Sequence, residues 1–227
     1  STISGGGIYI DSSAKFQAEN DGAQVFINDN TADYGGGISN NAKDNKSIFY
    51  CSFPCGNVAA LNGGNIFNNG RLAVYNSEMN TGIASGSHGE AANGGCIYNV
   101  NGSVLELDGV KGYLNKTGSG KEFGGFLCNE NGATVWTARC QFYQNQGKIG
   151  GAIYNNGEIH LGSTSINTNG GSVSGDKYIA EAYTANGGAV YNDGAGKLYV
   201  TDTSYIDHNA TTQNGGGIYN AGYFEPN

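Results

Sequence analysis

Pairs of acidic side chains are the part of this sequence that comes nearest to catalytic chemistry. Hydrolysis of a glycosidic bond needs two carboxyl groups that face each other across a sugar ring. Three groups of residues bring acids together: Glu106 with Asp108, Glu158 with His160, and Asp202 with Asp207 and His208. In the first two groups aliphatic residues alternate with the polar ones, which is typical of a strand whose acids point into solvent. We therefore predict no catalytic residues and no enzyme activity.

Other patterns of catalytic or metal-binding residues are weak. None of the histidines lies in the context of a nucleophilic triad, and Ser87-His88-Gly89 does not match the motifs typical of polygalacturonases. Oxygen-bearing side chains suited to Ca²⁺ occur close together, but without the spacing of an EF-hand: Asn28, Asp29, Asn30 and Asp33. We interpret them as a polar turn, so the sequence predicts no metal and no cofactor.

The cysteines number 5, so at least one thiol has no partner within the chain. Cys51 and Cys55 flank the segment Ser-Phe-Pro, and a short loop there would allow a local disulfide. Cys96 and Cys128 would lie about 8 Å apart in neighbouring repeats, which is long for a bridge. The predicted disulfide is therefore Cys51–Cys55.

Four Asn-x-Ser/Thr sequons offer sites for N-glycosylation if a eukaryote secretes the protein. Their acceptor residues are Asn45, Asn101, Asn115 and Asn209. Asn45 and Asn101 lie in polar turns, where a glycan fits. Asn115 and Asn209 belong to a regular column of Asn residues, and a side chain that bonds inward from such a column cannot carry a sugar.

A repeated hexapeptide predicts the elements that position these residues. Gly150-Gly151-Ala152-Ile153-Tyr154-Asn155 has seven variants, and successive copies start 30, 28, 31, 30, 26, 37 and 28 residues apart. A short motif repeated at a period of about 29 residues is typical of a solenoid. We expect the glycines to turn a corner, the aliphatic residue to point inward and the aromatic residue to point outward. The Asn suits a corner, because it tolerates left-handed backbone angles and its amide can bond the Asn of neighbouring copies.

Two further strands are expected in every repeat. One alternates apolar and polar residues, as at Leu105 and Leu107, and the other has an apolar residue followed three positions later by Asn, as at Phe142 and Asn145. Three short strands per turn predict a right-handed single-stranded parallel β-helix of about seven turns. We expect one domain over residues 1–227, part of a longer chain, with a protruding loop at 170–186.

The hexapeptides also predict an outward column of aromatic side chains. Such a column can stabilise the sheet through contacts between its own rings, or it can bind a partner. Its members are Tyr9, Phe67, Tyr98, Tyr154, Tyr191 and Tyr219.

The composition excludes several classes of function. Net charge is −8 and the 11 basic residues are scattered, so we expect no binding to nucleic acid. No apolar run approaches 18 residues, so we expect no insertion into a membrane. With 40 glycines and 13% charged residues, the chain suits a narrow core that continues from repeat to repeat.

The segment Phe142-Tyr143-Gln144-Asn145 followed by Gly150-Gly151-Ala152-Ile153 resembles the repeat of the chlamydial polymorphic outer-membrane proteins, which carry FxxN and GGA(I/L/V) motifs. The Tyr-rich and Asn-rich copies are more similar to the GGGIYN-type repeats in surface proteins of algae and other microbial eukaryotes. The resemblance covers almost the whole chain through short motifs. It implies a right-handed β-helix at a cell surface, often as an adhesin.

The leading hypothesis is an extracellular or cell-surface protein with a structural or adhesive role that acts through its flat faces. Its expected partners are other copies of itself, matrix components or a glycan. The alternative is an ice-binding protein with a flat face of low charge, for which Ser163-Thr164-Ser165 and Thr201-Asp202-Thr203 are the nearest approach to a Thr array. A polysaccharide lyase or hydrolase is the third hypothesis.

Overall fold

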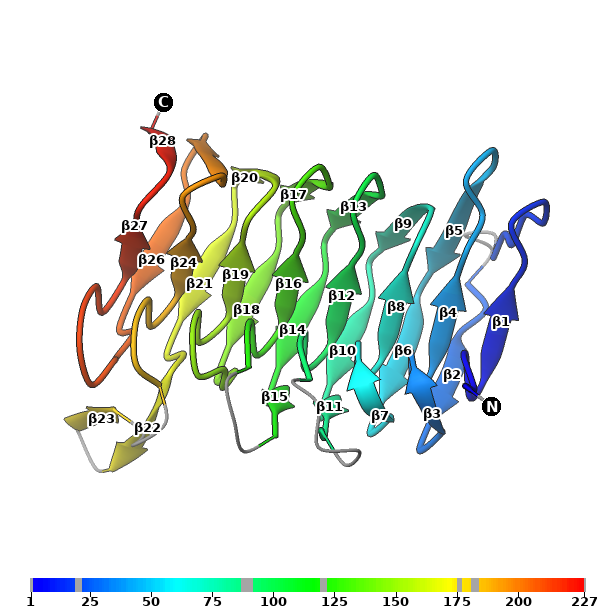
Figure 1. The fold of residues 1–227 in the computed structure, drawn as a ribbon, viewed down its shortest axis with the longest axis horizontal. Helices are drawn as coiled ribbons and strands as arrows, with labels where there is room; N and C mark the ends of the chain where they lie inside the picture. Colours follow the sequence, from blue (N-terminus) through cyan, green and yellow to red (C-terminus); the bar gives the residue numbers. More distant parts are fainter. Residues whose placement is uncertain are drawn as a thin grey trace.

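Strands stack in parallel along the whole molecule and form the predicted right-handed β-helix (Figure 1). The computed structural model describes residues 2–18, 22–86, 92–118, 122–174, 177–180 and 184–226. No part that it describes forms a helix long and apolar enough to cross a membrane.

The hexapeptides form sheet 1, in which the chain runs upward at the front of Figure 1. The Ile, Tyr and Asn positions of neighbouring copies pair directly, for example Ile153 with Val190, Tyr154 with Tyr191 and Asn155 with Asn192. Its eight strands are β1 (Ile8–Ile10), β4 (Ile38–Asn40), β8 (Ile66–Asn68), β12 (Ile97–Asn99), β16 (Leu127–Asn129), β19 (Ile153–Asn155), β24 (Val190–Asn192) and β27 (Ile218–Asn220).

Sheet 2 follows sheet 1 in each turn and contains the longest regular strands. Alternate residues such as Leu105 and Leu107 are buried, as the period of two predicts. Its strands are β5 (Lys46–Tyr50), β9 (Arg71–Tyr75), β13 (Val104–Asp108), β17 (Thr134–Ala138), β20 (Glu158–Gly162), β25 (Lys197–Thr201) and β28 (Tyr223–Pro226).

Sheet 3 completes the predicted three strands per turn and leads the chain back toward sheet 1. Its strands are β2 (Val25–Asn28), β6 (Ser52–Cys55), β10 (Glu78–Asn80), β14 (Lys111–Tyr113), β18 (Gln141–Tyr143), β21 (Ser165–Asn167) and β26 (Tyr205–Asp207).

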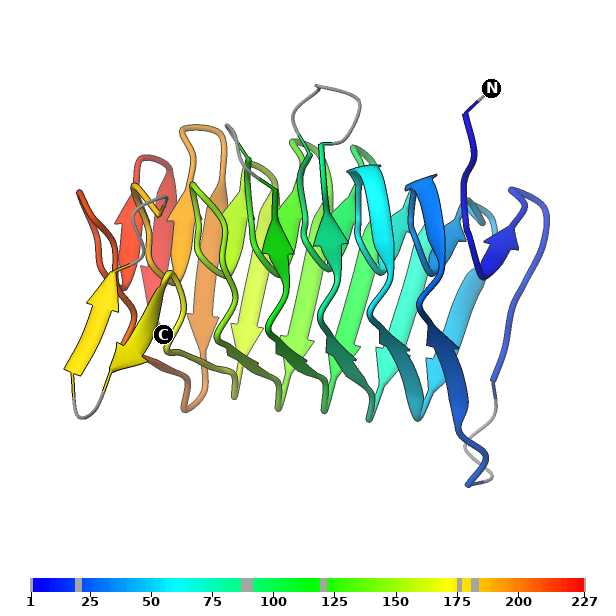
Figure 2. The ribbon, with the colours of Figure 1, turned by 90° about the horizontal axis from the view of Figure 1, so that it is seen from below.

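Four of the turns contain an additional short strand that the sequence did not predict. These strands form sheet 4, with β3 (Thr31–Tyr34), β7 (Val58–Asn62), β11 (Ile83–Ala84) and β15 (Lys116–Thr117). Within residues 170–186, β22 (Gly171–Ser174) and β23 (Lys177–Ala180) pair antiparallel and stand away from the coil (Figure 2).

The core is a continuous file of apolar side chains enclosed by the sheets. Ile153, Ile159, Leu161 and Ile166 belong to one turn and are all within 1% of complete burial. The corner before each hexapeptide strand has a physical reason for its glycines. Gly150 has φ 70°, and a Cβ at Gly151 would lie 2.1 Å from the carbonyl oxygen of Gly188.

The predicted Asn ladder is present, and its members are buried except for Asn220 at its C-terminal end. Each side-chain amide donates to the side-chain oxygen of the Asn one turn further along, at 2.7–2.9 Å. Such bonds satisfy buried polar groups that would otherwise be costly. The ladder runs through Asn40, Asn68, Asn99, Asn129, Asn155, Asn192 and Asn220.

A second Asn ladder runs along the corner after sheet 3, except that Asn65, directly before β8, supplies one of its amides. Its amide-to-oxygen distances are 2.8–3.4 Å. It runs through Asn30, Asn57, Asn65, Asn115, Asn145, Asn169 and Asn209.

The proposed backbone role of these Asn residues is wrong. At this corner the residues with positive φ directly precede the Asn, as Leu114, Gln144, Thr168 and His208 do. The Asn residues themselves do not adopt that conformation, so the amide side chain is the physical reason for Asn at these positions.

Candidate functional site

Rings at the centre of the strands of sheet 1 form the outward column that the sequence predicts. Tyr154 stacks on Tyr191 with ring centroids 5.7 Å apart, and Tyr191 stacks on Tyr219 at 4.6 Å. Phe67 stacks on Tyr98 in the same way, at 5.8 Å. Tyr9 lies at the N-terminal end and is exposed.

Two strands of sheet 1 lack an aromatic residue in this column, and rings from the preceding corner cover both gaps. Ser39 and Cys128 occupy the outward positions there and are 1% and 3% exposed. The residue just before the first corner glycine is aromatic in these two repeats. Tyr34 packs on Phe67 with centroids 5.0 Å apart, and Phe123 packs on Tyr154 at 4.4 Å. In these two repeats the aromatic residue stands before the first glycine instead of at the outward position of the strand. We did not recognise this pattern in the sequence.

Two phenol groups of this column bind carboxylates within the molecule. The hydroxyl of Tyr98 donates to Glu130, and that of Tyr154 donates to Asp193 at 2.5 Å. Burial, together with the neighbouring carboxylates, raises the pKa of both phenols well above the usual value. The stacked faces of the column and the two bound hydroxyls of Tyr98 and Tyr154 are therefore engaged within the molecule.

A second stack of rings, which we call the Trp136 stack, lies on the outer face of sheet 2. Trp136 stacks on His160 with centroids 3.6 Å apart and an interplanar angle of 8°. His160 in turn stacks on Tyr199 at 4.5 Å, and Tyr223 packs on Tyr199 at 5.7 Å. These four residues project from four consecutive strands. Trp136 remains 47% exposed.

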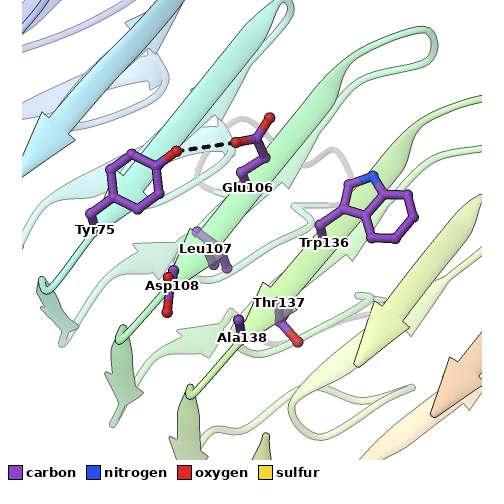
Figure 3. Close-up of a pocket in the computed structure, with 7 residues that line it drawn as sticks. All are labelled: Tyr75, Glu106, Leu107, Asp108, Trp136, Thr137 and Ala138. Carbon is purple, nitrogen blue, oxygen red and sulfur yellow. Dashed lines mark hydrogen bonds between the residues drawn. The ribbon is translucent and has the colours of Figure 1, made fainter. Parts of the chain in front are cut away.

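The stack ends at Trp136, and a pocket of about 500 Å³ opens beside it (Figure 3). On β13, the strand before β17 in the chain, the residue paired with Trp136 is Glu106. On β9, one strand earlier, the residue in line is Ala73. Neither supplies a ring to continue the stack. The pocket is lined by Tyr75, Glu106, Leu107, Asp108, Trp136, Thr137 and Ala138.

The Glu106 carboxylate is bound on the side of the pocket away from Trp136. It accepts hydrogen bonds from Lys46 at 2.9 and 3.1 Å and from the Tyr75 hydroxyl at 3.1 Å. Lys46 lies on β5, two strands before β13, so these bonds draw the carboxylate toward the N-terminal end. The bond to Glu106 raises the pKa of Lys46, against the effect of burial.

The second carboxylate of the pocket is also paired with a cation. Arg139 binds Asp108 through two nitrogens, at 2.6 and 2.8 Å, and this bidentate contact raises the pKa of Arg139. The pocket therefore combines one exposed aromatic ring, two paired carboxylates and the Tyr75 hydroxyl. Its two anions are balanced by two cations, so the site is close to neutral in charge.

The structure places the other acidic candidates apart from this pocket. Glu158 binds His160 at 2.8 Å and Lys197 at 3.5 Å, and the hydrogen bond to His160 is the main cause of its lowered pKa. Asp207 contacts His208 at 3.3 Å on the exposed corner after sheet 3. Asp202 lies with φ 56° at the corner between sheets 2 and 3. Ser87-His88-Gly89 falls outside the described residues.

The predicted Cys51–Cys55 disulfide is absent, and all five cysteines are free. The sequence suggested a loop between these residues, but Ser52–Cys55 is strand β6. Four residues of extended chain, at about 3.3 Å per residue, hold the two Cα atoms too far apart for a bridge.

The four sequons fall into two structural classes. Asn115 is fully buried and donates to Met79 and Asn145, and the amide of Asn209 donates to the carbonyl of Ile166 at 2.8 Å. Asn101 is exposed in the turn between sheets 1 and 2, and Asn45 is half-buried in the equivalent turn.

The described residues contain no group of three or more His, Cys, Asp and Glu side chains that could hold a metal ion. The oxygen-rich segment at 28–33 contributes Asn30 to the second Asn ladder.

The Ser and Thr side chains that suggested an ice-binding face do not lie in one column on one sheet. Thr164 is buried, Ser165 begins β21 on sheet 3 and Thr201 ends β25 on sheet 2.

Comparison of the chain with protein-family models, with curated proteins and with solved structures gave no match.

Proposed function

We propose that this protein is an extracellular or cell-surface module without enzyme activity that adheres to matrix material through the outer face of sheet 2. The observation that carries the proposal is the open end of the Trp136 stack. There a half-exposed indole ring borders a pocket of about 500 Å³ that also presents hydrogen-bonding groups. Binding sites commonly combine an apolar surface with a few oriented polar groups in this way.

The pairing of the carboxylates supports a binding role over hydrolysis. Glu106 and Asp108 lie in one pocket, as a glycoside hydrolase would require. Each is bound by a cationic side chain, Lys46 or Arg139, whereas hydrolysis needs one carboxylic acid that carries a proton.

Two further features support an extracellular location. The repeat motifs resemble those of surface proteins, and Asn101 offers an exposed sequon. We expect the native protein to carry N-linked glycan at Asn101 and none at Asn115, whose amide is consumed by the ladder. Mass spectrometry of glycopeptides from the native protein checks this, and glycan at Asn115 would contradict the buried ladder.

Co-sedimentation with insoluble matrix polysaccharides and isolated cell walls tests the adhesive function. A bulky charged residue on the outer face of sheet 2, Ala138→Arg, should abolish sedimentation of the protein. The matched control is Phe26→Arg on sheet 3, where the side chain is 63% exposed, and it should sediment as the unmodified protein does. Equal sedimentation of both variants, or no sedimentation of the unmodified protein, would contradict the proposal.

A further inference from the structure

We propose that the pocket beside Trp136 binds one pyranose ring of an uncharged polysaccharide, stacked on the free face of the indole. This inference rests on the proposed adhesive function and names the ligand class of the same face. It starts from the geometry of the Trp136 stack, in which rings repeat along the axis of the β-helix at the spacing of the strands.

The stack ends at Trp136, and the next position in line, on β13, carries no ring. His160 covers one face of Trp136 with centroids 3.6 Å apart, and no residue covers the opposite face with a ring in the described structure. Glu106 occupies the paired position on β13, but its carboxylate is drawn toward Lys46 and Tyr75. The pocket lies on the β13 side of Trp136, and Tyr75 borders it diagonally, because Tyr75 on β9 aligns with Asp108 and Ala138 rather than with Trp136. A volume of about 500 Å³ is in the usual range of ligand pockets and is sufficient for one six-membered sugar ring.

The indole selects for the apolar face of a sugar. The face of an aromatic ring carries partial negative charge, so it attracts the slightly positive C–H groups that line one side of a pyranose. One face of Trp136 stacks on His160, and the side chain nevertheless remains 47% exposed, which leaves the opposite face for a ligand. The stack behind it also limits the rotation of the indole, which lowers the entropy lost when a ligand binds.

The polar groups of the pocket suit the edge of the same ring. The Glu106 and Asp108 carboxylates keep lone pairs that can accept hydrogen bonds from sugar hydroxyls. Charge decides among the classes of sugar. Lys46 and Arg139 already neutralise the two carboxylates, so the pocket offers no unpaired anion for an amino sugar. A uronic acid would approach a protein of net charge −8 against repulsion.

The experiment uses the single Trp of the chain as its reporter. Because that residue is Trp136, a change in its fluorescence emission reports occupation of this pocket and of no other indole. The probes are hexasaccharides of β-1,4-glucose, β-1,3-glucose, β-1,4-mannose and β-1,4-xylose, with hexagalacturonate and hexaglucosamine as charged counterparts. At least one uncharged probe should shift and quench the emission in a saturable manner, and the charged probes should not.

Variants then test the stacking contact by calorimetry with the uncharged probe that binds best. Trp136→Ala should weaken association about tenfold, whereas Trp136→Phe, which keeps an aromatic face, should lose about threefold or less. The matched control Phe26→Ala removes an exposed ring from sheet 3 and should bind normally. Unchanged affinity of Trp136→Ala, or tighter binding of a charged probe, would overturn the inference.

Two negative outcomes separate this inference from the proposed function. If no uncharged probe perturbs Trp136 at millimolar concentration while the protein still sediments with matrix material, the pyranose site is wrong and the adhesive function stands. If the protein fails to sediment with any matrix material, the adhesive function itself is wrong.

Discussion

Aromatic rings stack on two faces of this β-helix, and the two faces differ at the positions where the next ring in line is absent. On sheet 1, Ser39 and Cys128 interrupt the column, and Tyr34 and Phe123 supply rings from the preceding corner. On sheet 2 the stack ends at Trp136, because Glu106 and Ala73 occupy the next two positions, and this end stays open as a pocket. We propose from this difference that the sheet 1 column stabilises the coil, whereas the sheet 2 stack presents a surface to a ligand.

Thiol reactivity should show the largest difference between the two faces. Cys128 lies in the covered gap, 3% exposed, and burial raises the pKa of its thiol well above the usual value. A cysteine placed in the open pocket, Ala138→Cys, should react with iodoacetamide at least about a hundredfold faster, because alkylation needs an accessible thiolate. Peptide mass spectrometry after timed alkylation measures both rates. Comparable rates would mean that the sheet 1 gap is open.

Removal of a ring should destabilise sheet 1 more than sheet 2. Tyr154 packs between Phe123 and Tyr191 and bonds Asp193, so Tyr154→Ala should lower the free energy of unfolding by about 2 kcal/mol. Trp136→Ala should cost about 1 kcal/mol or less, because the indole is half-exposed. Urea denaturation followed by circular dichroism measures both. Equal losses would remove the distinction between the faces.

High pH should weaken the protein through the phenols of sheet 1. Burial and the Asp193 carboxylate raise the pKa of Tyr154 in the folded state. The phenol of Tyr154 therefore contributes its full stabilisation of the fold below pH about 10, which is the pKa of tyrosine in the unfolded chain. This stabilisation is lost as the pH rises from there toward the pKa in the folded state. Because Tyr154 is only partly buried, solvent screens part of this effect, and between pH 8 and pH 11 the unmodified protein should lose up to about 1 kcal/mol more stability than Tyr154→Phe.

Urea denaturation at the two pH values provides this measurement. Tyr205→Phe, which changes an exposed phenol on sheet 3, is the control and should behave as the unmodified protein does. The same pH dependence in Tyr154→Phe would show that the phenol of Tyr154 is not the cause.

Completion of the sheet 2 stack should have the smallest effect on stability. Glu106→Tyr places a ring against the free face of Trp136 and removes the ion pair with Lys46, which is partly exposed. These contributions are of similar size, so the free energy of unfolding should change by less than about 1 kcal/mol. Thermal denaturation measures the change. A loss of several kcal/mol would mean that Glu106 supports the fold and that the pocket is incidental.

Much of the fold could be predicted because each position of the hexapeptide has the same structural role in every repeat. Ile153 fills the core, Tyr154 points outward and Asn155 extends the ladder, as the hexapeptide indicated. The corners after sheet 3 were harder, because residues as different as Leu114 and His208 take the left-handed conformation there. Side chains so different share no local preference for positive φ, so the sequence alone does not reveal this conformation.

The candidate site was predicted only in part. Glu106 and Asp108 were recognised as a pair on a solvated strand, and the structure places both in the pocket. Trp136, His160 and Tyr199 were not connected, because they lie on strands 24 and 39 residues apart in sequence. Their stacking depends on the register of sheet 2, which pairs Trp136 with His160 and His160 with Tyr199.

The most direct test of the different roles of the two faces is a crystal structure of the protein with the uncharged hexasaccharide that binds best. We expect one pyranose ring parallel to the indole of Trp136, with hydroxyls within hydrogen-bond distance of Glu106 or Asp108, and no sugar along the sheet 1 column. A sugar bound on the rings of Tyr98, Tyr154 or Tyr191, with the Trp136 pocket empty, would contradict the account.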